Sequence, residues 1–314
     1  MHYDSFFQIS LGNSVFFKFN LHVRAKTLPH FEIAQLPSLA CMAAGFSRFA
    51  GTRLFMVCCC LGYGQGQCVI SIKNLTVSYG QHPAIHHISG NFAAGSLCAV
   101  IGPNGSGKST LLKSIMGLEP KSGGSICIAT SPEQIAYLPQ LAEVDRSYPI
   151  TVEDCVLHGF WHKFGAFVAL NESHQLRAQM AIRTVGLKGF ERRAIGSLSS
   201  GQFQRVMFAR MLVQDAQLIL LDEPFNAIDS KTCAALLQIV EKWHRQKRTV
   251  IAVLHDEAQV RTFFPDTLLL AREVVAWGRT ADVLTPDNHC KARAMAEAWD
   301  DLADLCTIDT AVAT

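Results

Sequence analysis

Residues 102–109 place the strictest limit on what this chain can fold into. They read Gly-Pro-Asn-Gly-Ser-Gly-Lys-Ser, which matches the pattern G-x-x-x-x-G-K-[ST]. The apolar run 97–101 before them suits a buried strand, and residues 109–116 after them read as the first turns of a helix. A glycine-rich turn at a helix N-terminus directs backbone N–H groups and partial positive charge towards one point. The chain is therefore expected to bind the phosphates of a nucleoside triphosphate.

Each residue type in this loop has a separate expected role. The glycines let the backbone curl around phosphate oxygens, Lys108 pairs with the outer phosphates, and the Ser109 hydroxyl can ligate Mg²⁺. A chance match is the alternative, but the flanking strand and helix argue against it. The predicted nucleotide contacts are Gly102, Pro103, Asn104, Gly105, Ser106, Gly107, Lys108, Ser109 and Thr110.

Composition narrows the possible partners. Charged residues make up 17% of the 314 residues, below the usual quarter or so of a soluble domain, which indicates a surface partly covered by partners. The net charge of +2 and the lack of a Lys/Arg stripe make nucleic acid an unexpected partner. The best apolar run, residues 54–61, is too short to cross a bilayer. The cysteines form neither a disulfide framework nor paired zinc spacing, which favours a reducing, cytosolic setting.

The chain divides into three predicted parts. Residues 1–67 carry no usable motif and are expected to be an extension of uncertain order. A targeting peptide, or a true start nearer Met56, are the alternatives for this part. Residues 68–287 are predicted to form one domain around the nucleotide-binding loop, and residues 288–314 a C-terminal helix and tail.

The pattern of apolar residues predicts an α/β chain. Alternation predicts a strand at 69–79 and a further strand pair around 85–92. Helical spacing at 152–157 and 176–185 predicts a helical insert over about 141–200. Beyond the insert, the expected elements are a helix at 202–212, a strand at 218–221, an amphipathic helix at 231–243, a strand at 249–254 and a closing hairpin at 268–277. The continuous apolar strands indicate a mostly parallel core sheet.

Two carboxylates follow directly after the apolar run 218–221. Asp222 is suited to holding Mg²⁺ through water, and Glu223 to polarising the attacking water. The alternative is a polar strand end without chemistry. A pair of acids directly after four buried aliphatic residues is costly unless it meets a cation or water. These residues therefore predict hydrolysis of the bound nucleotide.

Residues 198–205, Leu-Ser-Ser-Gly-Gln-Phe-Gln-Arg, resemble the signature sequence of ATP-binding cassette ATPases. The order of motifs agrees, and the resemblance covers about residues 69–285. It implies a P-loop NTPase fold of ABC ATPase type, with an antiparallel β subdomain beside the core sheet. It also implies a homodimer in which the signature residues reach the ATP of the partner across the interface. These residues are Ser199, Ser200, Gly201 and Gln202; Ser200 stands where glycine is usual, and alone the segment reads as a turn and helix cap.

Four more residues match family positions. By resemblance, Tyr79 stacks on adenine, Gln140 touches Mg²⁺ or the attacking water, Asp229 crosses the dimer interface, and His255 is the switch histidine that reaches the γ-phosphate. Read alone, these would be a half-buried strand-end tyrosine, a loop glutamine, a helix cap and a core histidine. The resemblance therefore assigns Glu223, His255 and Gln140 to catalysis, and Ser109, Gln140 and Asp222 to Mg²⁺.

Residues 143–154 and 202–210 are similar to the ATPase subunits of zinc and manganese importers. This similarity implies an ATP-hydrolysing subunit at the cytoplasmic face of the cell membrane, using ATP and Mg²⁺. Its implied partners are integral membrane permease subunits and, indirectly, a substrate-binding protein. The alternatives are an importer ATPase for another small solute, a soluble cassette ATPase, or a nucleotide-binding regulator without turnover.

Overall fold

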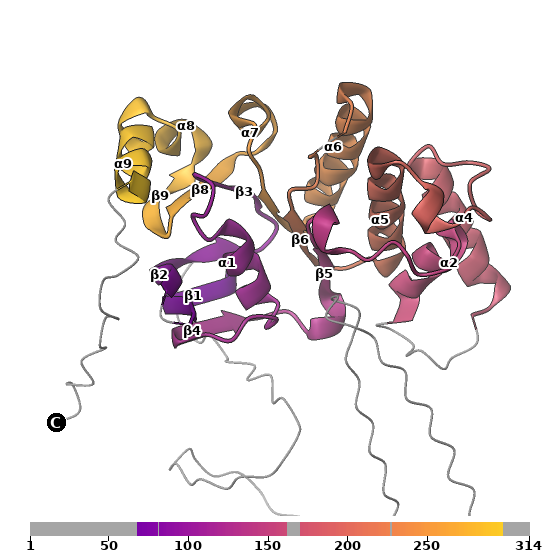
Figure 1. Ribbon diagram of the computed structural model, residues 1–314, viewed down its shortest axis with the longest axis horizontal. Helices are drawn as coiled ribbons and strands as arrows, with labels where there is room; N and C mark the ends of the chain where they lie inside the picture. The colour runs from indigo at the N-terminus through magenta and orange to yellow at the C-terminus, as the bar shows by residue number, and fades with distance from the viewer. Residues whose placement is uncertain (1–67, 81, 162–169, 227, 298–314) are drawn as a thin grey trace, which may run out of the picture. The chain divides into compact units, whose positions relative to one another are not determined.

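The computed structural model describes residues 68–80, 82–161, 170–226 and 228–297. They all lie in the second of the two units into which the chain divides, residues 57–314. The expected extension at 1–67 and the last residues of the expected tail, 298–314, fall outside the described residues. The described part consists of two sheets with helices packed on them (Figure 1).

The larger sheet has six strands in the order β5-β6-β7-β3-β8-β9. Strands β5, β6, β7, β3 and β8 run parallel, and β9 pairs antiparallel with β8. This confirms the predicted mostly parallel core sheet and its closing hairpin. The strands are β3 (Leu97–Ile101), β5 (Ile135–Leu138), β6 (Leu218–Asp222), β7 (Thr249–Val253), β8 (Asp266–Ala271) and β9 (Glu273–Arg279).

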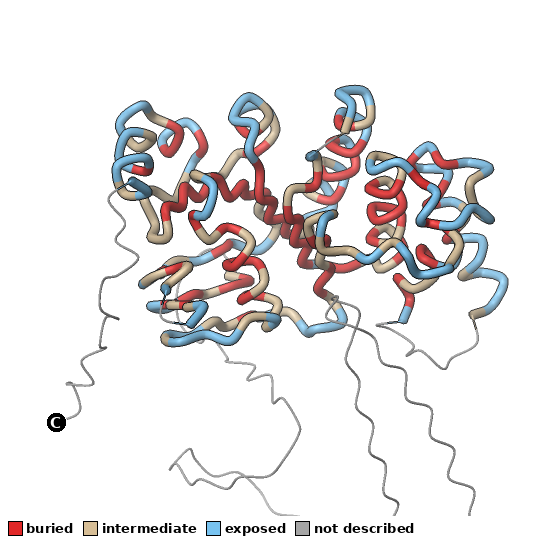
Figure 2. The backbone as a smooth tube through the Cα atoms, in the orientation of Figure 1, coloured by how far each residue is buried: buried red, intermediate tan, exposed pale blue. Residues whose placement is uncertain are grey.

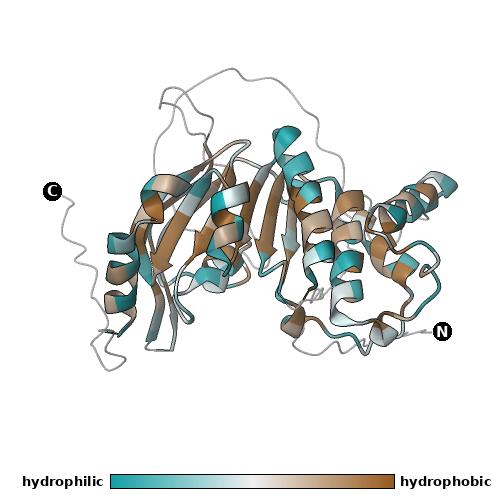
Figure 3. Cartoon of the chain, turned by 90° about the horizontal axis from the view of Figure 1, so that it is seen from above, coloured by the Kyte–Doolittle hydropathy of each residue, from teal (hydrophilic) through white to brown (hydrophobic). Residues whose placement is uncertain are grey.

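The central strands are buried along their whole length. Every residue of β3, β6 and β7 is buried, because helices or the second sheet cover both faces (Figure 2). In β3, Leu97 and Ala99 enter one core cluster and Cys98 enters the other, as the two-residue period of a strand requires. Continuous apolar runs are typical of such doubly covered strands, and the central strands in Figure 3 are mostly brown.

The second sheet is antiparallel, with the order β2-β1-β4. Its strands are β1 (Cys68–Tyr79), β2 (His82–Ala93) and β4 (Gly123–Ile128). The predicted strand pair around 85–92 is wrong: this segment is one strand, because β2 pairs with β1 from His82 to Ala93. Helix α1 (Lys108–Ile115) lies between the two sheets (Figure 1), with Leu111 and Leu112 buried in the cluster that joins them.

Three helices of the predicted insert and signature region pack against one another at the β5 end of the core sheet (Figure 1). They are α2 (Val152–Leu157), α4 (Glu172–Thr184) and α5 (Ser200–Gln214), and each begins with a capping box. The remaining helices are α6 (Ser230–Arg245), α7 (Glu257–Phe263), α8 (Thr280–Val283) and α9 (Pro286–Glu297), and 3₁₀ turns lie at Pro132–Gln134, Leu141–Glu143, His158–Phe160 and Ile195–Ser197. Within the described ranges, no helix has the length and apolar character needed to span a bilayer.

A substitution at Gly90 tests how closely the two sheets pack together. A Cβ at Gly90 in β2 would lie 2.1 Å from Cζ3 of Trp277 in β9, whose ring packs 4.6 Å from that of Phe92. We expect Gly90→Ala to lower the free energy of unfolding by about 2 kcal/mol, because the indole must move off its neighbours. Gly278→Ala is the control, since its Cβ meets nothing within 4 Å, and it should be neutral or slightly stabilising. Urea denaturation followed by circular dichroism measures both; equal stability of the two variants would contradict this packing.

Candidate nucleotide site

The candidate site is a cavity of about 750 Å³ where neighbouring core strands end. Loop residues 104–110, which follow β3, line one side of it, and Tyr79 at the end of β1 lies beside them. The other side is formed by residues that follow β5, β6 and β7, among them Gln140, Glu223 and His255. Because these strands are parallel, their carboxyl ends meet at one edge, where α/β proteins bind ligands.

The glycine pattern of the loop is required by close backbone contacts. Gly107 is the N-cap of α1 with φ 86°, and a Cβ there would lie 2.2 Å from Cγ2 of Ile85. A Cβ at Gly102 would lie 1.9 Å from the carbonyl oxygen of Leu270 in β8. Glycine is therefore the residue that fits at both positions, and the loop packs directly on β2 and β8.

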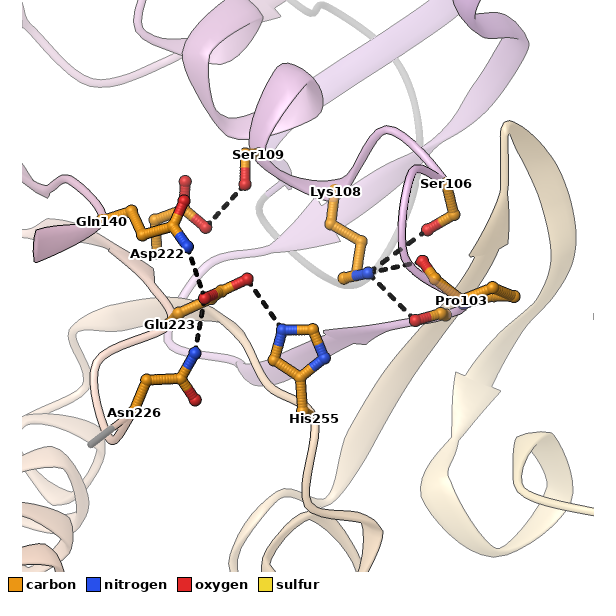
Figure 4. A network of polar contacts seen from close by, with 10 residues as sticks. Pro103, Ser106, Lys108, Ser109, Gln140, Asp222, Glu223, Asn226 and His255 are labelled. Atoms are coloured by element: carbon orange, nitrogen blue, oxygen red, sulfur yellow. Dashed lines mark hydrogen bonds and ion pairs between the residues drawn. The ribbon is translucent and has the colours of Figure 1, made fainter. Parts of the chain in front are cut away.

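Lys108 lies folded back over its own loop (Figure 4). Its Nζ donates to the carbonyl oxygens of Gly102 at 2.9 Å and Pro103 at 2.7 Å, and more weakly to Ser106 Oγ at 3.5 Å. Burial lowers the pKa of Lys108, and the negative charges of Glu223 and Asp222 oppose that effect. The ammonium group is therefore a desolvated cation whose partners are neutral oxygens, and it is suited to pairing with phosphate.

Ser109 and Asp222 join the loop to strand β6. The Ser109 hydroxyl donates to Oδ1 of Asp222 at 2.9 Å, and the Asp222 side chain is fully buried. In the described ranges no donor meets Oδ2 of Asp222 at full hydrogen-bond distance and angle, although the Tyr137 hydroxyl lies close enough to interact with this carboxylate. A hydroxyl and a buried carboxylate, one oxygen of which lacks a full hydrogen bond, form the hard-oxygen donor set that Mg²⁺ prefers, so the residues fit that ion.

Glu223 is the centre of the polar network in Figure 4. Its Oε1 lies 2.7 Å from Nε2 of His255, and its Oε2 accepts from Nε2 of Gln140 at 2.7 Å and from Nδ2 of Asn226 at 2.5 Å. The Glu223 backbone has φ 49°, a conformation uncommon for residues other than glycine. The predicted catalytic residues Gln140, Glu223 and His255 are therefore brought together, although up to 115 residues separate them.

Tyr79 lies at the mouth of the cavity. The residue is 49% exposed, and its hydroxyl lies 3.4 Å from Oγ1 of Thr110 in α1. A smaller cavity of about 370 Å³ adjoins it and shares Tyr79, Ala84 and Gly105 with the main cavity. An exposed aromatic ring beside the loop is positioned to stack on a nucleobase.

Comparison with known proteins decides the family. A family model described as ABC transporter matches residues 85–226. The manganese transport system ATP-binding protein MntB of Listeria monocytogenes is 39% identical over 224 residues, which covers 70% of this chain and 93% of that relative. The zinc transport system ATP-binding protein TroB of Treponema pallidum is 38% identical over 223 residues, covering 69% and 84% respectively. The chain belongs to the ABC transporter family.

Solved structures agree. An inward-facing metal-chelate type ABC transporter superimposes with a TM-score of 0.63 at 29% identity, covering 71% of this chain and 87% of that chain. A dimeric ATP-binding cassette in a post-hydrolysis state, bound to ADP and phosphate, gives 0.60 at 26% identity, covering 67% and 98%. This ABC ATPase accordingly binds nucleotide and hydrolyses ATP, as predicted.

The signature residues lie away from the cavity of their own chain. The residues that line the cavity in the described part of this ABC ATPase include none of 199–202 and not Asp229. Ser199 is the N-cap of α5 and exchanges hydrogen bonds with Gln202, and Asp229 is the N-cap of α6, where it accepts from Thr232 N at 2.9 Å. The helix-cap interpretation of both segments is thus observed, and their role at a dimer interface stays a prediction.

Two features of the site were not predicted from the sequence. Asn226 contacts Glu223 directly, and the only sequence signal for this was its spacing of three residues within one turn. Lys113 in α1 forms an ion pair at 2.5 Å with Glu143, which lies three residues after Gln140. This pair ties the Gln140 segment to α1.

The Tyr137 hydroxyl of β5 lies near the same carboxylates. Burial raises the pKa of this hydroxyl, and the negative charges of Asp222 and Glu143 raise it further.

Asp222 makes the stability of this ABC ATPase depend on pH. Burial raises the pKa of Asp222 to about 6, against a Ser109 hydrogen bond that lowers it. The folded state therefore binds this proton more tightly than the unfolded chain, so stability falls as pH rises from about 4 through 6. We expect Asp222→Asn, without nucleotide or Mg²⁺, to raise the free energy of unfolding by up to about 3 kcal/mol at pH 8 and by roughly half as much at pH 5.

Urea denaturation in EDTA at the two pH values measures this gain. The control is Asp287→Asn, which removes an exposed carboxylate from the first turn of α9 and should change stability by less than about 1 kcal/mol at either pH. A gain for Asp222→Asn that is the same at pH 5 and pH 8 would show that ionisation of Asp222 is not its cause.

Proposed function

We propose that this chain is the ATP-hydrolysing subunit of an importer for zinc or manganese. The observation that carries the hydrolytic part is the meeting of Gln140, Glu223 and His255 in the cavity beside the phosphate loop. The cargo is supported by the names of the manganese and zinc relatives and by the resemblance of residues 143–154 to such subunits.

In the proposed site, the loop and Lys108 hold the phosphates of ATP while Tyr79 stacks on the adenine. The ammonium of Lys108 exchanges the loop carbonyls of Gly102 and Pro103 for outer phosphate oxygens. The residues proposed to hold Mg²⁺ are Ser109, Asp222 and Gln140. When bound, the ion would supply positive charge that stabilises the negative charge on the phosphates.

Glu223 then acts on water and His255 on phosphate. The Glu223 carboxylate accepts a proton from the water that attacks the γ-phosphorus, and the bond from that phosphorus to the bridging oxygen of ADP breaks. His255 is close enough to this carboxylate, at 2.7 Å, for its ring to turn from Glu223 towards a γ-phosphate oxygen. Both residues follow buried strands, so their backbones are held in place.

The placement of the signature supports a working dimer. Residues 199–202 cap α5 and do not line the chain's own cavity, so in the proposed dimer the signature of a second copy reaches the bound ATP. Closure of the homodimer on ATP and its reopening after hydrolysis would move attached permease subunits at the cytoplasmic face of the membrane, which receive cargo from a substrate-binding protein.

Glu223→Gln and Lys108→Ala separate hydrolysis from binding. Glu223→Gln should lower kcat about 100-fold or more, keep ATP affinity and favour a closed dimer, because the amide retains the shape but accepts no proton. Lys108→Ala should weaken ATP binding about tenfold or more, because the cation opposite the phosphates is lost. Phosphate release, calorimetry and size-exclusion chromatography measure these effects. A Glu223→Gln rate within a few-fold of the wild type, or unchanged ATP affinity for Lys108→Ala, would contradict the assignment.

The cargo is tested in cells. A strain that lacks this chain should grow poorly under metal chelation and recover when zinc or manganese is added. The wild-type chain supplied in trans should restore growth, and Lys108→Ala, which is deficient in nucleotide binding, should not. A deletion strain that is indifferent to chelation but starves for another nutrient would refute metal import and leave the ATPase assignment intact.

A further inference from the structure

The Glu223 carboxylate accepts hydrogen bonds from residues on two other loops and from one residue in its own turn. Gln140 and His255 reach it from the loops after β5 and β7, which are separate segments of the chain. Asn226 reaches it from the turn that Glu223 itself begins, where Asn226 N–H donates to the Glu223 carbonyl at 3.3 Å. Figure 4 shows the Gln140 and Asn226 amides meeting Oε2 from opposite sides.

Under the proposed function, on which this inference rests, the contacts of Gln140 and His255 with Glu223 are lost during the reaction and that of Asn226 is kept. When Gln140 turns to the metal or water and His255 to the γ-phosphate, both leave the Glu223 carboxylate. Asn226 belongs to the same turn as Glu223, so it moves together with that residue. Its amide is therefore the contact that persists when nucleotide is bound.

The backbone of this turn is held firmly. Gln204, a buried residue of α5, donates from Nε2 to the carbonyl oxygen of Pro224 at 2.7 Å, and Pro224 itself is buried. Strand β6 fixes the other end through its pairing with β7. The remaining freedom of Glu223 lies in its side-chain torsions, which a hydrogen-bond donor from the same turn can restrict.

We propose that Asn226 is the positioning residue for the proposed catalytic base. Its amide N–H holds Oε2 and fixes the side-chain torsions of Glu223, which leaves Oε1 free for the attacking water after His255 has turned away. Asn226 touches neither the reacting phosphorus nor the water in this assignment, and it acts through Glu223.

Two substitutions in the full chain test this role. Asn226→Ala removes the donor and should lower kcat about tenfold, with the KM for ATP within about twofold, because positioning is lost while binding is retained. Asn226→Asp keeps the shape but sets a second carboxylate against Glu223, and it should lower kcat about 100-fold. Melting temperatures of both variants check that the fold is intact. Asn91→Asp is the matched control: it adds the same charge at an exposed position of β2 that lines neither cavity, and kcat should be unchanged.

A double variant identifies the residue through which Asn226 acts. In the Glu223→Gln background, Asn226→Ala should leave the residual rate unchanged, because the group that it positions is already disabled. An Asn226→Ala kcat within twofold of the wild type, a parallel loss of ATP affinity, or an equal loss of rate in the Glu223→Gln background would each overturn the proposal. If instead Glu223→Gln itself hydrolyses ATP normally, the proposed role of Glu223 has failed first, and the two failures are distinguishable.

Discussion

Four adjacent parallel strands, β5, β6, β7 and β3, end at one edge of the core sheet, and the whole site depends on that alignment. The phosphate loop and three acting side chains each follow one of these strands. The pairing of Asp222 with Val253 sets the register, so the residues just beyond, Glu223 and His255, come within hydrogen-bond distance. A slip of one residue would turn Asp222 to the opposite face of the sheet and break its bond with Ser109.

The site costs the fold part of its stability. Asp222 keeps a carboxylate in the buried core, and Glu223 has a strained backbone at the end of the same strand. A buried carboxylate whose pKa rises to about 6 costs on the order of 3 kcal/mol at neutral pH, a large share of the 5–15 kcal/mol that a typical domain has in total. The doubly covered apolar strands offset this cost. Nucleotide and metal would remove part of it, so binding and folding are coupled at this edge.

The elements that were predicted best from the sequence are those signalled by short runs of neighbouring residues. Strand β3, helix α2 and the phosphate loop were predicted closely, because each is signalled by adjacent residues. Strand β5 was not predicted, because its four residues are too few to show a period, and the predicted pair at 85–92 proved to be one strand. The Asn226 contact depends on the φ of Glu223, which no residue pattern reveals. The roles of residues 199–202 stay predictions, because these residues do not line the cavity of their own chain.

The bond from Gln204 to the Pro224 carbonyl has a consequence for how two such subunits would work. Helix α5 begins at the signature, which is proposed to face the ATP of the partner, and Gln204 in its second turn holds the turn that carries this chain's own Glu223. In the proposed dimer, a displacement of α5 by the partner's nucleotide would reach the turn of Glu223 through this one buried hydrogen bond. Two sites linked in this way would be coupled reciprocally, so that ATP binding at either site would change the ATP affinity of the other by the same factor.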